Sequence, residues 1–379
     1  MQDKAEDQQA TGIVINLGGR VAVLDDINAK PKIVADRPEG TERLDVYKLT
    51  DPRQLPSGQI LGIQDGSVVA IDPQAPQKAV TLTSATRWFP SVQNTQVWAI
   101  NEEPVTTGCE GETIPESVRA RFSMTELAVS GGPSRRTLVL PCGLEPFAET
   151  SKGIIAQQTT EDDPVSGNAT VARTRVVLLD KNATAVSQVL EESATILAAA
   201  GSRTVWKRDN CNGAACLKLH DTETKAVRKA PTCTAGELVG RGAFDQSGRW
   251  YASAVRGNNG YHLALLDLDQ DKCKDLGSNT NLSGNHDLDA DVTATWSQSN
   301  LLVLDSLSGS LTSVSALSGK QEARDQDLDV SEGAQVWGTL TGEAGDLAAR
   351  SVPGRTRSAG RPTVHLPRPR DQRGDDSSP

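Results

Sequence analysis

Short apolar runs that close on an aspartate recur along this chain. They read VAVLD, VVAID, VVLLD, LKLHD and LALLD, and they end at Asp25, Asp72, Asp180, Asp221 and Asp267. The intervals between these aspartates are 47, 108, 41 and 46 residues, and the long one divides into 58 and 50 if LAVS, ending at Ser130, is a degenerate copy. With a further copy ending near Ser318, the repetition indicates seven units of a propeller or another repeat array.

The segments around these runs predict strands rather than helices. Apolar stretches of four to seven residues alternate with Gly, Pro, Asn, Asp and Ser, which favour turns. No dozen residues keep a helical period with capping residues. The clearest unit, residues 242–276, divides into four strands, and residues 53–82 and 295–323 follow the same order. In the last of these, Asp305 ends the second strand of its unit instead of the third.

Seven third strands follow from this alignment. They are expected at residues 20–25, 67–72, 124–130, 174–180, 216–221, 261–267 and about 310–318. The first unit begins near Ile13, too late to contain its own innermost strand, whereas one strand-like run, residues 334–340, follows the seventh unit. This run would complete the first blade and close the ring, which removes an open sheet edge.

The predicted fold is therefore an all-β, seven-bladed β-propeller of four-stranded antiparallel blades, closed by a C-terminal strand. Six or eight blades stay open as alternatives because residues 101–130 are irregular. We expect a disordered leader over residues 1–11, the propeller over 12–347 and a disordered Arg/Pro-rich tail over 348–379. The tail is interpreted as solvated, and the alternative is an arginine-rich arm that touches an anionic polymer or lipid surface.

The composition of the chain argues against several classes of function. Apolar residues make up 37% of the chain and aromatic residues 3%, so valine, leucine and alanine must fill most of the core. The formal net charge of −10 argues against a general nucleic-acid-binding surface. No apolar stretch approaches the ~18 residues of a membrane-spanning helix, and the polar N-terminus contains no signal-peptide core.

The cysteine count points to an oxidising compartment. Local pairings account for all six cysteines: Cys211–Cys216, Cys233–Cys273 and Cys109–Cys142. A zinc site built from four of them would need compact C-x2-C pairs, which the chain does not contain. We therefore expect an extracellular or cell-envelope protein whose export signal is not present in this sequence, and six unrelated thiols are the alternative.

One unit resembles a known kind of repeat. The segment FDQSGRWYASAVRGNNGYHLALLDLDQDK is similar to the repeat of TolB-like and WD-repeat β-propellers, with Phe244, Ser247, Gly248, Arg249 and Asp267 at the typical places. No unit has the Trp-Asp dipeptide and histidine network of true WD repeats, so the TolB-like group is closer. The resemblance implies a propeller over roughly residues 12–345, in a group that mostly binds proteins or peptides, often at the cell envelope.

Three acidic clusters are candidate metal sites. Their aspartates are spaced at i, i+2 and i+4: Asp267, Asp269 and Asp271; Asp287, Asp289 and Asp291; Asp325, Asp327 and Asp329. Calcium loops also need a glycine at position six, where these clusters have lysine or valine. Solvated turns are the simpler interpretation, and the cluster at residues 287–291 is the best candidate for calcium. We expect no other cofactor.

The sequence contains no strong catalytic motif. The sequence contains no G-x-S-x-G elbow and only four histidines, of which His220 and His262 are interpreted as turn or core residues. Six tryptophans could bind carbohydrate on a surface groove: Trp88, Trp98, Trp206, Trp250, Trp296 and Trp337. Five of the six lie in strand-like runs, so packing between blades is the favoured interpretation.

The predicted function is a non-enzymatic, extracytoplasmic and monomeric propeller that binds a protein or peptide through its loop face. The longest insertion, residues 101–121, is the candidate partner-binding loop, with acidic side chains at Glu102, Glu103, Glu110, Glu112 and Glu116. Deleting residues 104–117 is expected to leave folding intact and abolish capture of the partner. The alternatives are a metal-dependent hydrolase or lyase at the mouth of the central channel and a carbohydrate-binding module.

Overall fold

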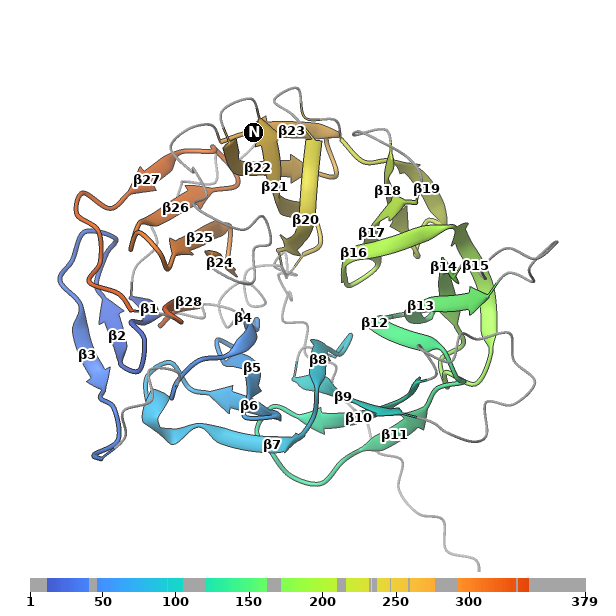
Figure 1. The fold of residues 1–379 in the computed structure, drawn as a ribbon, viewed down its shortest axis with the longest axis horizontal. Coiled ribbons are helices and arrows are strands. Elements are labelled where there is room, and N and C mark those ends of the chain that lie inside the picture. The colour runs from blue at the N-terminus through green and yellow to red at the C-terminus, as the bar shows by residue number, and fades with distance from the viewer. Residues whose placement is uncertain are drawn as a thin grey trace, which may run out of the picture. The chain divides into compact units, whose positions relative to one another are not determined.

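The computed structural model describes residues 12–40, 46–93, 95–104, 120–161, 172–209, 216–231, 233, 237–245, 247–257, 260–276, 292–331 and 333–340. Seven four-stranded antiparallel sheets form a ring around a central axis (Figure 1). The all-β, seven-bladed prediction is confirmed, and the alternatives of six or eight blades are not needed. In each blade we call the strands a to d, from the axis outward.

The blades contain the following strands, in the order a to d. Blade 1 contains β28 (Gln335–Thr339), β1 (Ile13–Asn16), β2 (Val21–Leu24) and β3 (Lys32–Ala35). Blade 2 contains β4 (Thr50–Gln54), β5 (Ile60–Gln64), β6 (Ser67–Ile71) and β7 (Val80–Ser84), with the short 3-10 helix η1 (Pro76–Lys78) before β7. Blade 3 contains β8 (Arg87–Pro90), β9 (Gln96–Pro104), β10 (Ala120–Ala128) and β11 (Arg136–Val139).

The remaining four blades follow the chain in the same way. Blade 4 contains β12 (Leu144–Thr150), β13 (Gly153–Glu161), β14 (Ala172–Leu179) and β15 (Val186–Glu192). Blade 5 contains β16 (Ala194–Ala200), β17 (Arg203–Arg208), β18 (Leu217–Asp221) and β19 (Ala226–Lys229). Blade 6 contains β20 (Glu237–Phe244), β21 (Trp250–Gly257), β22 (Gly260–Asp267) and β23 (Lys272–Asp275). Blade 7 contains β24 (Val292–Ser297), β25 (Asn300–Asp305), β26 (Leu311–Ser315) and β27 (Gln321–Ala323).

The seven predicted third strands coincide with the c strands. These are β2, β6, β10, β14, β18, β22 and β26. Asp305 ends strand b of blade 7, as the alignment predicted. The repeat phrase therefore counted the blades correctly, because one apolar strand in each blade ends where the chain must turn back.

Most of the repeat aspartates cap the turn that follows strand c. The carboxylates of Asp72, Asp180, Asp221 and Asp267 each accept a hydrogen bond from a backbone N–H two to four residues later. Asp25 departs from this pattern, because its carboxylate pairs with Lys32 Nζ at 2.5 Å while its neighbour Asp26 caps the turn. An aspartate suits these positions because its short side chain can reach the nearby backbone donors of a turn.

The C-terminal strand closes the ring, as predicted. Strand β28 pairs with β1 as the innermost strand of blade 1. The side-chain amide of the buried Gln335 accepts from Leu49 N–H at 2.9 Å and donates to Leu49 C=O at 2.6 Å. Gln54, on β4, makes the same pair of bonds to the backbone of Thr339, at 3.0 and 2.6 Å. Two buried amides thus fasten the closing strand to blade 2.

The core is divided among the spaces between neighbouring blades, which we call seams. Each of the seven seams contains one cluster of buried apolar side chains within the described residues. Five of the six tryptophans are at least 96% buried in these clusters, namely Trp88, Trp98, Trp206, Trp296 and Trp337. Their predicted place between blades is therefore confirmed.

The described residues end at Leu340. The predicted leader over residues 1–11 and the predicted tail over 348–379 lie outside them, as does the second compact unit of the chain, Gly345–Pro379. Within the described part, no helix has the length and apolar character needed to cross a membrane.

Candidate functional site

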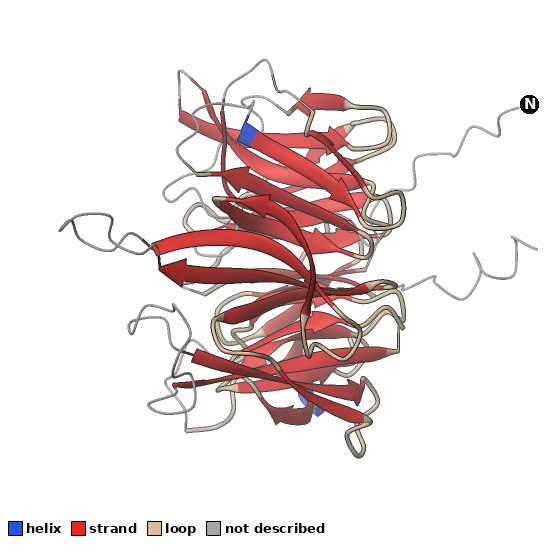
Figure 2. Cartoon of the chain, turned by 90° about the vertical axis from the view of Figure 1, so that its right-hand side faces the viewer, coloured by secondary structure: helices blue, strands red, loops and turns tan. Residues whose placement is uncertain are grey.

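Strand order divides the connections between two faces of the ring. The a–b and c–d turns lie on one face, which we call the turn face, and the b–c and d–a connections lie on the other, the loop face. Blades 3, 4 and 6 have b–c hairpins with strands of eight or nine residues, compared with four to six in blades 1, 2, 5 and 7, and both strands have nine only in blade 3. Seen edge-on, the hairpin nearest the viewer, that of β13 and β14 in blade 4, projects from one side of the ring at mid-height (Figure 2).

The hairpin of blade 3 corrects the predicted insertion. Residues 101–104 belong to β9 and residues 120–121 to β10, so the connection is residues 105–119. Glu102 and Glu103 are therefore strand residues, exposed and paired with Phe122 and Arg121 across the hairpin. Glu110, Glu112 and Glu116 lie outside the described residues. Sequence alone placed all five glutamates in one loop because a strand end with exposed charges looks like loop.

A half-buried ion pair lies at the base of this hairpin. Arg87, at the start of β8, pairs with Glu145 on β12 of blade 4. The Arg87 guanidinium also lies 5.2 Å from the ring centre of Phe122. The loop-face end of the seam between blades 3 and 4 thus combines charges of both signs with an aromatic ring, a composition frequent in protein interfaces.

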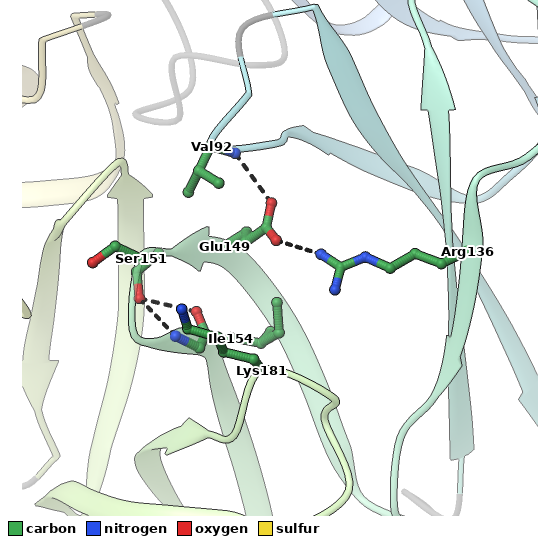
Figure 3. A pocket seen from close by; sticks show the side chains of 8 residues that line it. Val92, Arg136, Glu149, Ser151, Ile154 and Lys181 are labelled. Atoms are coloured by element: carbon green, nitrogen blue, oxygen red, sulfur yellow. Dashed lines mark hydrogen bonds and ion pairs between the residues drawn. The ribbon is translucent and has the colours of Figure 1, made fainter. Parts of the chain in front are cut away.

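A cavity opens on the turn face of the same seam, between blades 3 and 4. Its volume is about 190 Å³, and its lining includes Val92, Arg136, Glu149, Ser151 and Lys181 (Figure 3). This is smaller than the roughly 300–1,000 Å³ of sites that enclose a drug-sized ligand.

Glu149 dominates the chemistry of this cavity. It is 8% exposed, and its carboxylate accepts from Ser91 Oγ at 2.6 Å, Trp98 Nε1 at 2.9 Å, Val92 N–H at 3.1 Å and Arg136 at 2.6 Å. Burial alone would raise the pKa of Glu149, but these four donors outweigh it and hold the pKa below its ordinary value. A carboxylate held ionised in this way fastens two blades together and is poorly suited to donating a proton.

Arg136 connects Glu149 with a second buried carboxylate. Its Nε donates to Glu126 at 2.9 Å, and its guanidinium stacks 4.6 Å from the ring centre of Trp98. Nothing in the sequence signalled this cluster, because its members come from five different strands or turns and no local spacing relates them.

The acidic clusters are placed as follows. In the cluster on the c–d turn of blade 6, each aspartate pairs with an arginine: Asp267 with Arg249, Asp269 with Arg203, and Asp271 with Arg228. The interpretation as a solvated turn is therefore wrong for Asp267, which is 4% exposed. Arg203 and Arg228 come from blade 5, so this cluster joins two blades. No group of three potential ligands that could hold a metal ion occurs among the described residues.

The best calcium candidate cannot be placed. Asp287, Asp289 and Asp291 lie outside the described residues, so that site stays a prediction. Asp325, Asp327 and Asp329 are exposed on the connection between blade 7 and the closing strand.

The cysteines and histidines also have defined positions. Cys233, after blade 5, forms a disulfide with Cys273 on β23, the pairing expected from sequence, with 5.1 Å between their Cα atoms. Cys142 and Cys216 are also disulfide-bonded, and their predicted partners, Cys109 and Cys211, lie outside the described residues. His262 Nε2 lies 2.7 Å from a carboxylate oxygen of Asp275, and His220 is buried in blade 5.

Comparison with known proteins shows the fold class. No family model and no curated protein sequence matches the chain. Among solved structures, an acylaminoacyl peptidase from Pyrococcus horikoshii superposes with a TM-score of 0.50 at 9% identity, over 82% of this chain and 48% of the peptidase. This chain therefore spans about half the length of that enzyme.

Two smaller propellers also match. TolB from Acinetobacter baumannii gives a TM-score of 0.39 at 12% identity, over 88% of this chain and 81% of TolB. AztD from Citrobacter koseri gives 0.46 at 14%, over 86% and 96%. The chain is a β-propeller. At such identities the likeness shows the fold and nothing finer, because one fold hosts many functions.

Proposed function

We propose that this chain is a non-enzymatic propeller that binds a protein or peptide partner on its loop face, through the projecting hairpin of blade 3. The observation that carries the proposal is the register of β9 and β10. Nine consecutive residue pairs, from Ala128↔Gln96 to Ala120↔Pro104, run without a bulge along the whole length of the two strands. A regular hairpin anchored by the buried Trp98 holds its outer residues in a fixed position, which lowers the entropic cost of binding.

The chemistry of the hairpin favours a basic partner surface. Glu102 and Glu103 are exposed on opposite faces of β9, and the connecting sequence adds Glu110, Glu112 and Glu116. Carboxylates gathered on a projecting element attract lysine and arginine side chains and raise the association rate, and salt weakens both effects. We therefore expect capture of the partner to weaken as ionic strength rises.

A charge-reversal experiment tests this proposal. The double variant Glu102→Lys/Glu103→Lys is compared with Asp327→Lys/Asp329→Lys, which makes the same change in net charge at exposed positions elsewhere on the ring. Both variants should keep the thermal midpoint of the wild type. Cross-linking in native extract followed by mass spectrometry should recover the same basic partner with wild type and control, and lose it with the hairpin variant. Equal recovery by all three proteins would refute the hairpin as the binding element.

An extracytoplasmic location belongs to the same proposal. It is supported by the Cys233–Cys273 disulfide and by the bonded state of Cys142 and Cys216, since disulfides persist mainly in oxidising compartments. Protein isolated from its native source under thiol-blocking conditions should contain no free thiol. Six blocked thiols would place the protein in a reducing compartment.

A further inference from the structure

The seam between blades 4 and 5 contains three buried polar groups without a protein partner. They are the hydroxyl of Thr204, the indole N–H of Trp206 and Nδ1 of His220. Thr204 and Trp206 are 0% exposed and His220 is 2% exposed. Buried polar atoms in proteins are nearly always hydrogen-bonded, so three such atoms in one place need an explanation.

The three groups lie together on one side of blade 5. Thr204 and His220 face each other across β17 and β18, and the rings of Trp206 and His220 are 5.7 Å apart between centres. Trp206 packs into the apolar cluster that also contains Val176 and Leu178 of blade 4. The opposing side chains in that cluster are hydrocarbon and offer no hydrogen bond.

The other buried tryptophans show that this arrangement is unusual in the ring. The indole N–H groups of Trp88, Trp98, Trp296 and Trp337 each donate to a protein oxygen, at 3.2, 2.9, 3.1 and 3.3 Å. Trp206 is as deeply buried as Trp98 and Trp337, yet its N–H has no acceptor among the described residues. A molecule from outside the chain could supply that acceptor.

We propose that the seam between blades 4 and 5 is a binding site for one internal water molecule, held by Thr204, Trp206 and His220. The water accepts a hydrogen bond from Trp206 Nε1, donates to Nδ1 of a neutral His220, and bonds to Thr204 Oγ1 in either direction. Three such bonds are typical of a buried water, whereas a metal ion would find one nitrogen ligand and an indole N–H that cannot coordinate it. Burial, which lowers the pKa of His220, keeps the imidazole in the neutral form that this geometry uses.

The direction in which one substitution shifts the thermal midpoint tests this proposal. In Thr204→Val, a methyl group replaces the hydroxyl at nearly constant shape. If the water is present, it loses a partner and the thermal midpoint falls. If the seam is dry, an unsatisfied hydroxyl is removed and the midpoint stays or rises. Thr137→Val, on the exposed outer strand β11, corrects for the strand preference of valine. A Thr204→Val midpoint at or above that of this control overturns the proposal.

A second measurement does not depend on the variant folding. In wild-type protein labelled with ¹⁵N, the indole proton of Trp206 should show a cross-relaxation peak to a water molecule of long residence time, identified by its loss in Trp206→Phe. The indole proton of Trp98, which donates to Glu149, should show none. Absence of the peak at Trp206 overturns the proposal, and an equal peak at both indoles would assign the signal to general solvent penetration and overturn it too.

Discussion

Two buried tryptophans pack against blade 4, one from each neighbouring blade. They differ in the hydrogen bonding of the indole N–H. Trp98 of blade 3 donates its indole N–H to Glu149, whose carboxylate also binds Ser91, Val92 and Arg136. Trp206 of blade 5 faces Val176 and Leu178, and its N–H has no protein acceptor. The comparison teaches that a buried polar group stabilises a seam only when its hydrogen bond is made, by a side chain of the protein or by a bound water.

The largest expected effect comes from breaking the satisfied seam. Glu149→Ala removes the common acceptor of four donors and leaves the Trp98 indole unpaired, so the free energy of unfolding should fall by about 3 kcal/mol, as for other broken buried ion pairs. Glu145→Ala serves as the control, because its pair with Arg87 is about a third exposed and should contribute under about 1 kcal/mol. Urea denaturation of both variants measures the difference. Similar losses would show that the Glu149 cluster has no special weight.

The closing seam provides an intermediate case. Gln335→Leu introduces an apolar side chain of similar size and leaves both backbone groups of Leu49 without their side-chain partner. The expected loss in the free energy of unfolding is about 2 kcal/mol, since each unsatisfied buried group costs about 1–3 kcal/mol before relaxation. The exposed Gln77→Leu, on the turn before β7, is the matched control and should change stability little. A Gln335→Leu protein as stable as its control would mean that strand pairing with β1 closes the ring unaided.

The smallest of the expected effects on stability is a dependence on pH. The seams on the two sides of blade 4 should lose stability in different pH ranges as acid is added. The pKa of His220 is lowered in the folded state by burial, with Asp221 opposing, so the unfolded chain binds the proton more readily. Stability from this residue is present at neutral pH and is lost as pH falls below about 6.5. Burial raises the pKa of Glu149, but its hydrogen-bond donors lower it by more, so the pKa in the folded state is below the ordinary value. The stability that Glu149 contributes is therefore lost only as pH falls below about 4.5.

A pH series of urea midpoints measures both windows. His220→Gln should flatten the curve as pH falls below about 6.5, because the substituted side chain does not titrate. Glu149→Gln should change the curve only at lower pH. Lys218 on the same face of β18 and the Glu191–Arg208 pair across the seam are the nearby charges that stay unchanged in these variants. A slope that His220→Gln does not alter would assign the upper window to another group.

Sequence reasoning predicted the fold closely but the site poorly. The recurring aspartates located five of the seven c strands, the degenerate copies ending at Ser130 and near Ser318 located the other two, and the unpaired run at residues 334–340 identified the closing strand. Both are local signals, because an apolar strand and its turn are adjacent in the chain. No local pattern in the sequence marks Glu149, Gln54 or Gln335, because their hydrogen-bond partners lie far away along the chain.

The amino-acid sequence by itself determined the all-β class, the strand order within a blade and the way the ring closes, because strand and turn preferences act over a few residues. It favoured seven blades, and the tertiary structure confirmed that number over six or eight. Only the tertiary structure decided which buried polar groups are satisfied. Glu149 meets Ser91, Trp98 and Arg136 from segments 13–58 residues away, while Trp206 meets hydrocarbon. These contacts depend on how one blade packs against the next, and no spacing along the chain predicts them.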